Sequence, residues 1–526
     1  MSPPTNMSRF ATARQSSYGT LPVPSVFTKK RASFSLLAAI IVTGACLSIL
    51  LCVATSPVSW SSSPPRMRLA AESVVPLTSA QLIQPRQIHL AYAGATPGTG
   101  MTVSWASYRR VNDSTLWVGT SPTDLTLATV AAETVSYYAD DVYSLFTYHA
   151  TLTGLTPRSK YFYRVGSASD ASNVSPVYHF HTAREPRDDD DTSFEIAVYA
   201  DFGERNAQDT VSLLLGLKER FDFIWHVGDI SYADNAFHTL NADTAALGFV
   251  YEKAYNAWMD ALGPAMSQVP YMTTVGNHEA ECYSPICLYS PEKQAQLSNY
   301  SAYNARFRMP SGDSHGAANM WYSWSHGFVH FISVSSETDY DGAPTNNKGT
   351  KVRNGGFGDQ LAWLQADLAR VNRSETPWVI LGSHRPIYGL KVYKPNGDPK
   401  TKHRALLNAF EPLLLKYKVD AVVSGHQHAY ERHLPIAYNE PVVAGVSADK
   451  AVYESPRAPV YIVSGSCGST GGHEPYVDVA AQTWNVMYDN VHFGISTLKV
   501  NKTALEWSFV HAADGAIIDR FVMTKQ

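Results

Sequence analysis

Two histidines separated by a single residue stand directly after an apolar run, in the stretch VVSGHQHAYER at residues 422–432. The run stops at Ser424 and Gly425, so His426 and His428 are expected at the carboxyl end of a buried strand. Imidazole is the commonest metal ligand in proteins, and a metal site would need further ligands from other parts of the chain. Without such ligands, the pair would be ordinary core or surface histidines.

Four more strand-like segments end in a side chain that is able to bind a metal ion. Asp201 ends FEIAVYAD, Asp229 ends FDFIWHVGD, Asn277 follows VPYMTTVG, and His384 ends WVILGSH. In open α/β sheets, ligands bind beyond the carboxyl ends of the strands, so these five endings are expected to converge. Each ending alone is a common pattern, but the ordered set of five favours a metal centre.

The motifs DxG, GDxxY, GNHE, xxxH and GHxH, in this order, resemble the signature of purple acid phosphatases, within the calcineurin-like metallophosphoesterases. The resemblance extends from about Gln84 to the C-terminal strands. It implies two metal ions, an Fe(III) and a second divalent ion, which would be Zn, Mn or Fe. By this resemblance, the Fe(III) ligands are Asp201, Asp229, Tyr232 and His428, and the ligands of the second ion are Asp229, Asn277, His384 and His426. The residue types agree, because carboxylate and phenolate oxygens suit trivalent iron, whereas imidazole and amide groups suit divalent ions.

Tyr232 distinguishes this family from other phosphoesterases. It stands three residues after Asp229 in GDISY. In the family that the chain resembles, a tyrosinate bound to Fe(III) gives the protein its colour. A metallophosphoesterase without this tyrosine is expected to be colourless and to use other metals; the alternative role for Tyr232 is that of a packed aromatic residue.

The resemblance implies an acid phosphatase that hydrolyses phosphate monoesters by attack of a metal-bound hydroxide. Its substrates would be phosphorylated small molecules or phosphoproteins. His278 resembles the family's histidine beside the metals, which binds the phosphate or protonates the leaving oxygen, and Asn277 is expected to contact substrate as well. Plant members carry one or two further histidines after the GSH-like motif, but here none occurs before His403. Tyr388, Lys391 and Tyr393 are therefore the local candidates for substrate contact. Lys391 would pair with phosphate, the alternative being a solvated surface lysine.

The elements needed to position these residues fall into two parts. Short alternating runs at 84–184 predict a fibronectin III-like β-sandwich, and the charged segment EPRDDDDTS at 185–193 is a linker. Strands then alternate with helices over 194–526, including the C-terminal strands. The expected fold class is α/β, with the sandwich followed by a two-sheet α/β metallophosphoesterase sandwich as the catalytic domain.

The N-terminal region is expected to lie outside the fold. Residues 34–54 carry no charge and are long enough to span a bilayer, and basic residues precede them. We predict a cytosolic tail at 1–33, a signal anchor at 34–54 and a stem at 55–83, giving a type II membrane protein whose catalytic domain is lumenal or extracellular. The alternative is secretion after cleavage.

Sequons and cysteines agree with the secretory pathway. The predicted glycosylation sites are Asn112, Asn173, Asn299, Asn372 and Asn501. Cys282 and Cys287 lie close together in CYSPIC and are expected to form a disulfide in an oxidising compartment, the alternative being metal binding. Cys467 is left over, either buried or paired between chains.

Composition limits the remaining choices. The chain has 526 residues, 45% of them hydrophobic, which is enough for more than one domain. Its net charge of -4 argues against a nucleic-acid partner. Two alternative functions stay open at this point: a colourless metallophosphodiesterase or nucleotide hydrolase on the same core, and a non-catalytic adhesion ectodomain. The assembly is expected to be a possible homodimer.

Overall fold

The computed structural model describes residues 77–525, except 140–143, 187–191, 204, 239–249, 283–289, 345–352 and 478–480. The predicted tail and signal anchor, with most of the stem, lie outside the described residues. Within these described ranges, no helix is both long and apolar enough to cross a membrane. The last residues of the predicted stem form a short helix, α2 (Ser79–Ile83), which Thr78 caps through its hydroxyl.

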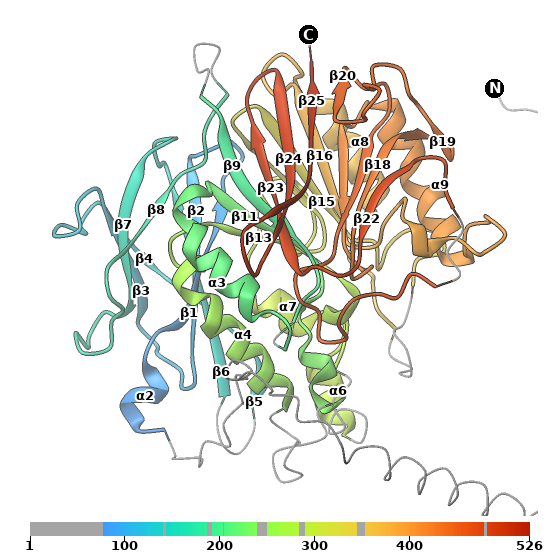
Figure 1. Ribbon diagram of the computed structural model, residues 1–526. Coiled ribbons are helices and arrows are strands. Elements are labelled where there is room, and N and C mark those ends of the chain that lie inside the picture. The colour runs from blue at the N-terminus through green and yellow to red at the C-terminus, as the bar shows by residue number, and fades with distance from the viewer. Residues whose placement is uncertain are drawn as a thin grey trace, which may run out of the picture. The chain divides into compact units, whose positions relative to one another are not determined.

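The first part of the structure is a sandwich of two four-stranded antiparallel sheets (Figure 1). Their strand orders are β1-β2-β6-β5 and β4-β3-β7-β8. Large side chains fill the space between the sheets, among them Trp105, Leu116, Tyr148 and Tyr163. The strands are β1 (Arg86–Ala93), β2 (Gly100–Ser107), β3 (Ser114–Gly119), β4 (Ala128–Ala131), β5 (Glu133–Ala139), β6 (Ser144–Thr153), β7 (Lys160–Ser167) and β8 (Tyr178–His181).

Strand β1 is buried along almost its whole length, not only on alternate residues. One of its faces belongs to the sandwich, and the strand also contacts helix α4 (Val250–Met266) and strand β13 (Tyr271–Thr274) of the following part. A strand covered on both faces loses the alternation of a half-buried strand. The sandwich is therefore packed onto the rest of the described chain through this sheet.

The second part contains two larger mixed sheets. The seven-stranded sheet has the order β13-β11-β9-β23-β24-β25-β20, and the eight-stranded sheet has the order β14-β15-β16-β17-β21-β18-β19, with β22 paired to β18. A short pair, β10-β12, stands apart. The strands of the seven-stranded sheet and the short pair are β9 (Phe194–Tyr199), β10 (Phe202–Gly203), β11 (Phe223–Val227), β12 (Ile230–Ser231), β13, β20 (Val452–Glu454), β23 (Gly494–Val500), β24 (Ala504–His511) and β25 (Ile517–Thr524). Those of the eight-stranded sheet are β14 (Tyr322–His326), β15 (Val329–Val334), β16 (Trp378–Ser383), β17 (Ala421–Ser424), β18 (Tyr430–Ala437), β19 (Glu440–Pro441), β21 (Val460–Ser464) and β22 (Asn485–Asp489).

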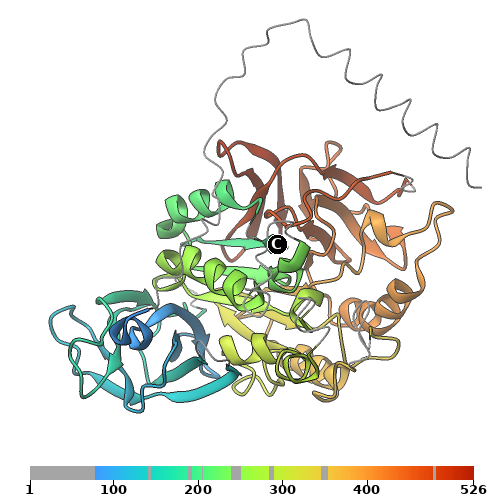
Figure 2. The same cartoon turned by 90° about the horizontal axis from the view of Figure 1, so that it is seen from below.

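An aromatic core joins the two large sheets. Trp225 of β11 packs edge-on against Trp324 of β14 and Phe331 of β15, with ring centroids 5.2 and 5.7 Å apart. Figures 1 and 2 show α3 and α4 beside the seven-stranded sheet, and α8 and α9 beside the eight-stranded sheet. The remaining helices are α3 (Gln208–Leu217), α6 (Pro291–Gln296), α7 (Ser301–Arg306), α8 (Gln360–Arg370) and α9 (Thr401–Lys416), with the 3₁₀ helices η1 (Lys218–Arg220), η2 (Ala233–His238), η4 (Asn277–Glu279) and η5 (Leu390–Val392).

The strands that were expected to carry ligands run in parallel within each sheet. Strand β11 is parallel to both β9 and β13, and β16 is parallel to β17. The carboxyl ends of β9, β11 and β13 therefore lie along one edge of the first sheet, and those of β16 and β17 along one edge of the second. The side chains directly after these strands make the contacts between the two edges.

Candidate metal centre

The candidate ligands stand in turns with strained backbone. Asp201, Asp229, Tyr232 and His426 all have positive φ, between 54° and 66°. For residues other than glycine this conformation costs about 1 kcal/mol each, and such strain collects at functional sites. The strained residues follow β9 (Asp201), β11 (Asp229), β12 (Tyr232) and β17 (His426).

Two glycines allow the turns to approach each other. A Cβ atom on Gly425 would lie 2.3 Å from the Cβ of Ala200 and 2.5 Å from Oδ2 of Asp201. A Cβ atom on Gly276 would lie 2.4 Å from both the backbone nitrogen and Oδ1 of Asp229. Only glycine fits at these distances, which brings the loop after β17 against that after β9, and the loop after β13 against that after β11.

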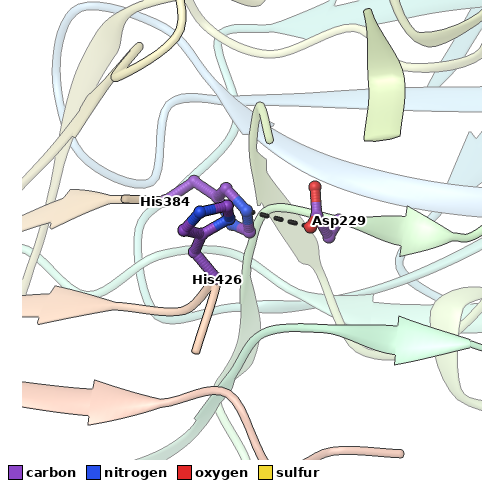
Figure 3. A group of neighbouring side chains, drawn as sticks. All are labelled: Asp229, His384 and His426. Atoms are coloured by element: carbon purple, nitrogen blue, oxygen red, sulfur yellow. Dashed lines mark ion pairs between the residues drawn. The ribbon is translucent and has the colours of Figure 1, made fainter. Parts of the chain in front are cut away.

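Asp229, His384 and His426 form one half of the candidate centre, in which one donor atom from each lies within 4.8 Å of the others (Figure 3). Within this group, Oδ2 of Asp229 and Nε2 of His384 are 3.0 Å apart. His384 Nδ1 lies 3.0 Å from the carbonyl oxygen of Val227, to which it donates, so the lone pair of the neutral ring is on Nε2. Two electron-pair donors at this distance require a cation between them, either a proton or a metal ion.

The protonation states of His384 and His426 are compatible with metal binding. Burial disfavours a charge on His384, but the negative charge of Asp229 outweighs this effect and raises the pKa of His384 to about 9. The proton on His384 therefore balances the charge of the carboxylate, as a metal ion bound there would. Burial and the positive charge of Arg385 hold the pKa of His426 well below its usual value. His426 is therefore a neutral imidazole, the form that binds metals.

The other half of the candidate centre contains Asp201, Tyr232 and His428. The Tyr232 hydroxyl donates to Oδ1 of Asp201 at 2.9 Å and lies 2.9 Å from Nε2 of His428. Burial and the charges of Asp201 and Asp229 hold the pKa of Tyr232 well above its usual value. A phenolate at this position therefore requires strong positive charge beside it, which a trivalent ion would supply.

Asp201 also connects the two halves. Its Oδ2 accepts a hydrogen bond from the backbone N–H of His426 at 2.7 Å. The backbone N–H of His278 donates to Oδ1 of Asp229 at 2.8 Å, so the turn that begins with Asn277 is fixed to the same site. The structure thus brings six of the seven candidate ligands together from both sheets and places the seventh, Asn277, at the start of the turn that contacts Asp229.

His278 has a buried partner that the sequence did not reveal. Its Nδ1 lies 2.8 Å from both carboxylate oxygens of Asp234, and its Nε2 lies 3.8 Å from Oδ2 of Asp229. Burial disfavours a charged imidazole, but the charges of Asp234 and Asp229 outweigh it and raise the pKa of His278 to about 10. His278 is therefore a cation whose Nε2–H faces the centre. Asp234 stands five residues after Asp229 in the sequence, and no spacing rule connects it with His278.

A cavity of about 510 Å³ adjoins His426. Lys391 lines this cavity, with its Nζ donating to the carbonyl oxygen of Pro475 at 2.6 Å. Tyr393 is buried, its hydroxyl donates to Asn439 at 2.9 Å, and the residues that line the cavity do not include it. His403 of α9 does line the cavity, although its distance from the GSH motif in the sequence argued against a role for it.

Other predicted sites have different outcomes. Asn173 is only 2% exposed in the folded structure, and its glycosylation stays a prediction. Asn112 and Asn372 are exposed, while Asn299 and Asn501 are partly buried. Cys282 is disulfide-bonded, but Cys287 lies outside the described residues, so their pairing stays a prediction. Cys467 is a buried free thiol.

Comparison with known proteins assigns the chain to a family. Three family models match: "Purple acid Phosphatase, N-terminal domain" at residues 85–182, "Calcineurin-like phosphoesterase" at 194–430, and "Iron/zinc purple acid phosphatase-like protein C" at 458–520. Acid phosphatase type 7 of Homo sapiens is 31% identical, over 77% of this chain and 82% of the relative. The chain belongs to the purple acid phosphatase family. An acid phosphatase of Aspergillus ficuum is 29% identical, over 73% of this chain and 76% of the relative.

A solved purple acid phosphatase has the same fold. The enzyme PPD1 from yellow lupin (Lupinus luteus) seeds matches with a TM-score of 0.65 and 22% identity, over 84% of this chain and 75% of that chain. The predicted family and fold class are thus confirmed. As a purple acid phosphatase, the protein is an enzyme that hydrolyses phosphate monoesters at a binuclear metal centre.

Proposed function

We propose that this purple acid phosphatase holds its metal pair through the seven residues described above. Fe(III) would be bound by Asp201, Asp229, Tyr232 and His428, and a divalent ion by Asp229, Asn277, His384 and His426. The observation that carries this assignment is the approach of Asp229, His384 and His426 within 4.8 Å, with Nε2 of His384 aimed at the carboxylate. Asp229 would be shared by both ions, because it lies between the histidine pair and the Asp201 loop.

The two ions, when bound, supply positive charge that stabilises the transition state and lowers the pKa of the attacking water. The chain supplies the rest. We assign to His278 the donation of an Nε2 proton to the phosphate or to the leaving oxygen, because Asp234 holds the opposite ring nitrogen at 2.8 Å. Asn277 would contact the phosphate from the same turn.

For substrate contact, the cavity beside His426 is the site that we propose. Lys391 lines it and is expected to attract phosphorylated small molecules or phosphoproteins. Tyr393 has other partners in the described structure, so its role as a substrate contact stays a prediction. Activity against bis-esters, compared with monoesters, separates the monoesterase from a phosphodiesterase or nucleotide hydrolase on the same core.

We also propose that the catalytic part is lumenal or extracellular, held by a signal anchor at 34–54, with secretion after cleavage as the second candidate. This rests on the uncharged span and on the exposed sequons at Asn112 and Asn372. N-terminal sequencing of the mature protein, together with membrane fractionation, decides between the two. A homodimer stays a prediction that analytical ultracentrifugation would test.

The test of the metal assignment is elemental analysis together with a visible spectrum of the purified catalytic part. Iron with a tyrosinate absorption band is the expected result, and Tyr232→Phe should lose the band because it removes the phenolate. Zinc alone, without a band, would contradict the assignment of Fe(III) to Tyr232. A band that persists in Tyr232→Phe would show that another residue is the phenolate ligand.

A further inference from the structure

Arg385 reaches the candidate metal centre from the residue directly after His384. Its guanidinium is fixed on one side, where Nε donates to both carboxylate oxygens of Glu337 at 2.9 Å and the second terminal nitrogen lies 2.8 Å from Oε2. Glu337 is itself buried, with 2% exposure. The backbone N–H of Arg385 donates to the hydroxyl of Ser336 at 2.8 Å, so both ends of the residue are held. The remaining nitrogen, Nη1, points away from Glu337 and lies 2.8 Å from Nε2 of His426.

The hydrogen bond between Arg385 and His426 cannot exist at the same time as metal binding by His426. A guanidinium only donates hydrogen bonds, so Nε2 of His426 must offer its lone pair to Arg385. A neutral imidazole has one such lone pair. If His426 binds the metal through Nε2, no lone pair remains for Arg385; if it binds through Nδ1, then Nε2 carries a hydrogen that repels the N–H of Arg385. Metal binding therefore leaves Nη1 of Arg385 without its acceptor.

A charged donor that has lost its acceptor in a largely buried site needs a new one. The side chain of Arg385 is 22% exposed, and with His426 it lines the cavity described above. Three lysines also line the cavity, together with one carboxylate, that of Glu474, which lies 3.2 Å from Lys391 Nζ. The acceptor that enters here is therefore an anion, and the reaction supplies one beside the metals, the phosphoryl group.

We propose that Arg385 binds the phosphoryl group of the substrate, with Nη1 turning from His426 to a phosphate oxygen when the metal pair is in place. The inference rests on the proposed role of His426 as a metal ligand. Glu337 is the positioning residue, because it holds the guanidinium while Nη1 changes partner. Arg385 would thus supply a cation where this chain lacks the histidines that plant members carry after the GSH motif.

Three variants test the proposal on the metal-loaded enzyme. Arg385→Lys keeps the charge but loses the planar fork. Arg385→Gln removes the charge but leaves Glu337 buried and unpaired, which endangers folding. The double variant Glu337→Gln/Arg385→Gln keeps a neutral hydrogen-bonding pair and the net charge of the chain, so it tests the role even if the single variant does not fold. Arg520→Gln is the matched control, because Arg520 is 54% exposed, pairs with Glu506 of β24 and does not line the cavity.

Two quantities are measured apart from activity. Titration calorimetry gives the Kd for inorganic phosphate, and equilibrium dialysis at fixed free Zn²⁺ followed by elemental analysis gives the metal content. In Arg385→Lys and in the double variant, the Kd for phosphate should rise about 10- to 100-fold. The double variant, which loses a competing donor to His426, should bind metal at least as well as the wild type. With p-nitrophenyl phosphate, KM should rise in the same variants, while the KM of Arg520→Gln should stay within about twofold of the wild-type value.

A phosphate Kd that is unchanged within about twofold in both variants would overturn the proposal. So would a rise in Kd that accompanies loss of metal, because Arg385 would then support His426 without touching phosphate. Failure of the metal assignment looks different, since wild-type protein would hold no metal at these residues. That result would overturn the proposed function and this inference with it.

Discussion

Asp229 lies between the histidines of one half of the candidate centre and the turn that carries His278. Its Oδ2 is 3.0 Å from His384 Nε2, and its Oδ1 accepts from the backbone N–H of His278 at 2.8 Å. Asp229→Asn keeps the size of the side chain but removes the charge that two cations would share. We expect turnover to fall by more than about 100-fold and the metal content to fall with it, measured by steady-state kinetics and elemental analysis.

The control for this variant is Asp514→Asn, which changes a carboxylate with 62% side-chain exposure in the turn between β24 and β25. It should leave turnover and metal content unchanged. Near-normal turnover in Asp229→Asn would refute the assignment of Asp229 as the shared ligand.

The pair of His278 and Asp234 separates proton donation from metal binding. We expect His278→Gln to lower kcat by about 100-fold or more with its metal content retained, because the Nε2–H is lost while Asp229 and Asn277 remain. Asp234→Asn should lower kcat by about 10- to 100-fold, because the imidazole loses the carboxylate that orients it. Kinetics with parallel elemental analysis checks both. Equal kcat in wild type and His278→Gln would mean that His278 only orients its loop.

The sequence pointed to the residues that could bind metals but not to the groups that hold them. The candidate ligands stand at strand ends, in motifs that are local in the chain. Asp234 meets His278 across 44 residues, and Glu337 meets Arg385 across 48. No periodicity or capping rule links residues so far apart, so these contacts come only from the folded arrangement of the two sheets.

At the scale of elements, Glu279 ties the loop after β11 to the loop after β13. Its carboxylate accepts three backbone hydrogen bonds, from Asp229 at 3.0 Å, Ile230 at 2.7 Å and Gly276 at 2.7 Å. Glu279 is 3% exposed, so water cannot replace these bonds. Glu279→Ala should lower the free energy of unfolding by about 3 kcal/mol or more, because several buried N–H groups lose their acceptor.

Glu279→Gln is the matched variant for this prediction. It keeps the shape but has one acceptor oxygen in place of two, so its loss of stability should lie between those of wild type and alanine. Chemical denaturation of the three proteins gives this order. Equal stability of the alanine variant and wild type would show that Glu279 is not what holds the two loops.

Helices and strands were predictable where their pattern was uninterrupted. The strand-like runs that end at the candidate ligands appear in the structure as β9, β11, β13, β16 and β17. Helices α4 and α9 did not stand out, because each contains a proline, Pro264 and Pro412, which breaks the helical pattern in the sequence. In α9 packing compensates, since Leu406, Phe410 and Leu414 are buried along one face.

At the scale of the whole described molecule, buried charges join the sandwich to the catalytic part. Arg306 of α7 pairs with Glu252 of α4 at 2.6 Å, and both side chains are almost fully buried. The same guanidinium donates to Gln87 and Tyr137 of the sandwich at 3.0 and 2.8 Å. The sequence predicts a linker at 185–193, but it does not reveal a junction made of paired charges, because a charged residue alone does not show which residue it contacts in the fold.

Asp222 forms a second such junction, and its ionisation makes it testable by pH. Arg184, at the end of the sandwich, donates through Nε to Oδ2 at 2.6 Å, and Nε2 of His326 lies 3.0 Å from the same oxygen. Burial disfavours the charge, but the hydrogen bonds and charges of His326 and Arg184 outweigh it and hold the pKa of Asp222 below its usual value. A carboxyl whose folded pKa is lowered stabilises the fold above its unfolded pKa, near about 3.9, and loses this contribution as pH falls through the folded pKa.

Asp222→Asn resembles the protonated carboxyl at every pH, so its effect on stability must depend on pH. At pH 7 we expect the variant to be less stable than wild type by about 1 to 3 kcal/mol, because Arg184 and His326 lose a buried charged acceptor. As the pH falls below about 4, wild-type Asp222 takes up its own proton and the difference should shrink toward zero. Thermal unfolding of both proteins across this range measures it, with Glu506→Gln, which breaks the exposed pair with Arg520, expected to change stability by less than about 1 kcal/mol throughout. A difference between Asp222→Asn and wild type that stays constant from pH 7 to pH 3 would mean that the shape of the side chain, and not its charge, joins the two parts.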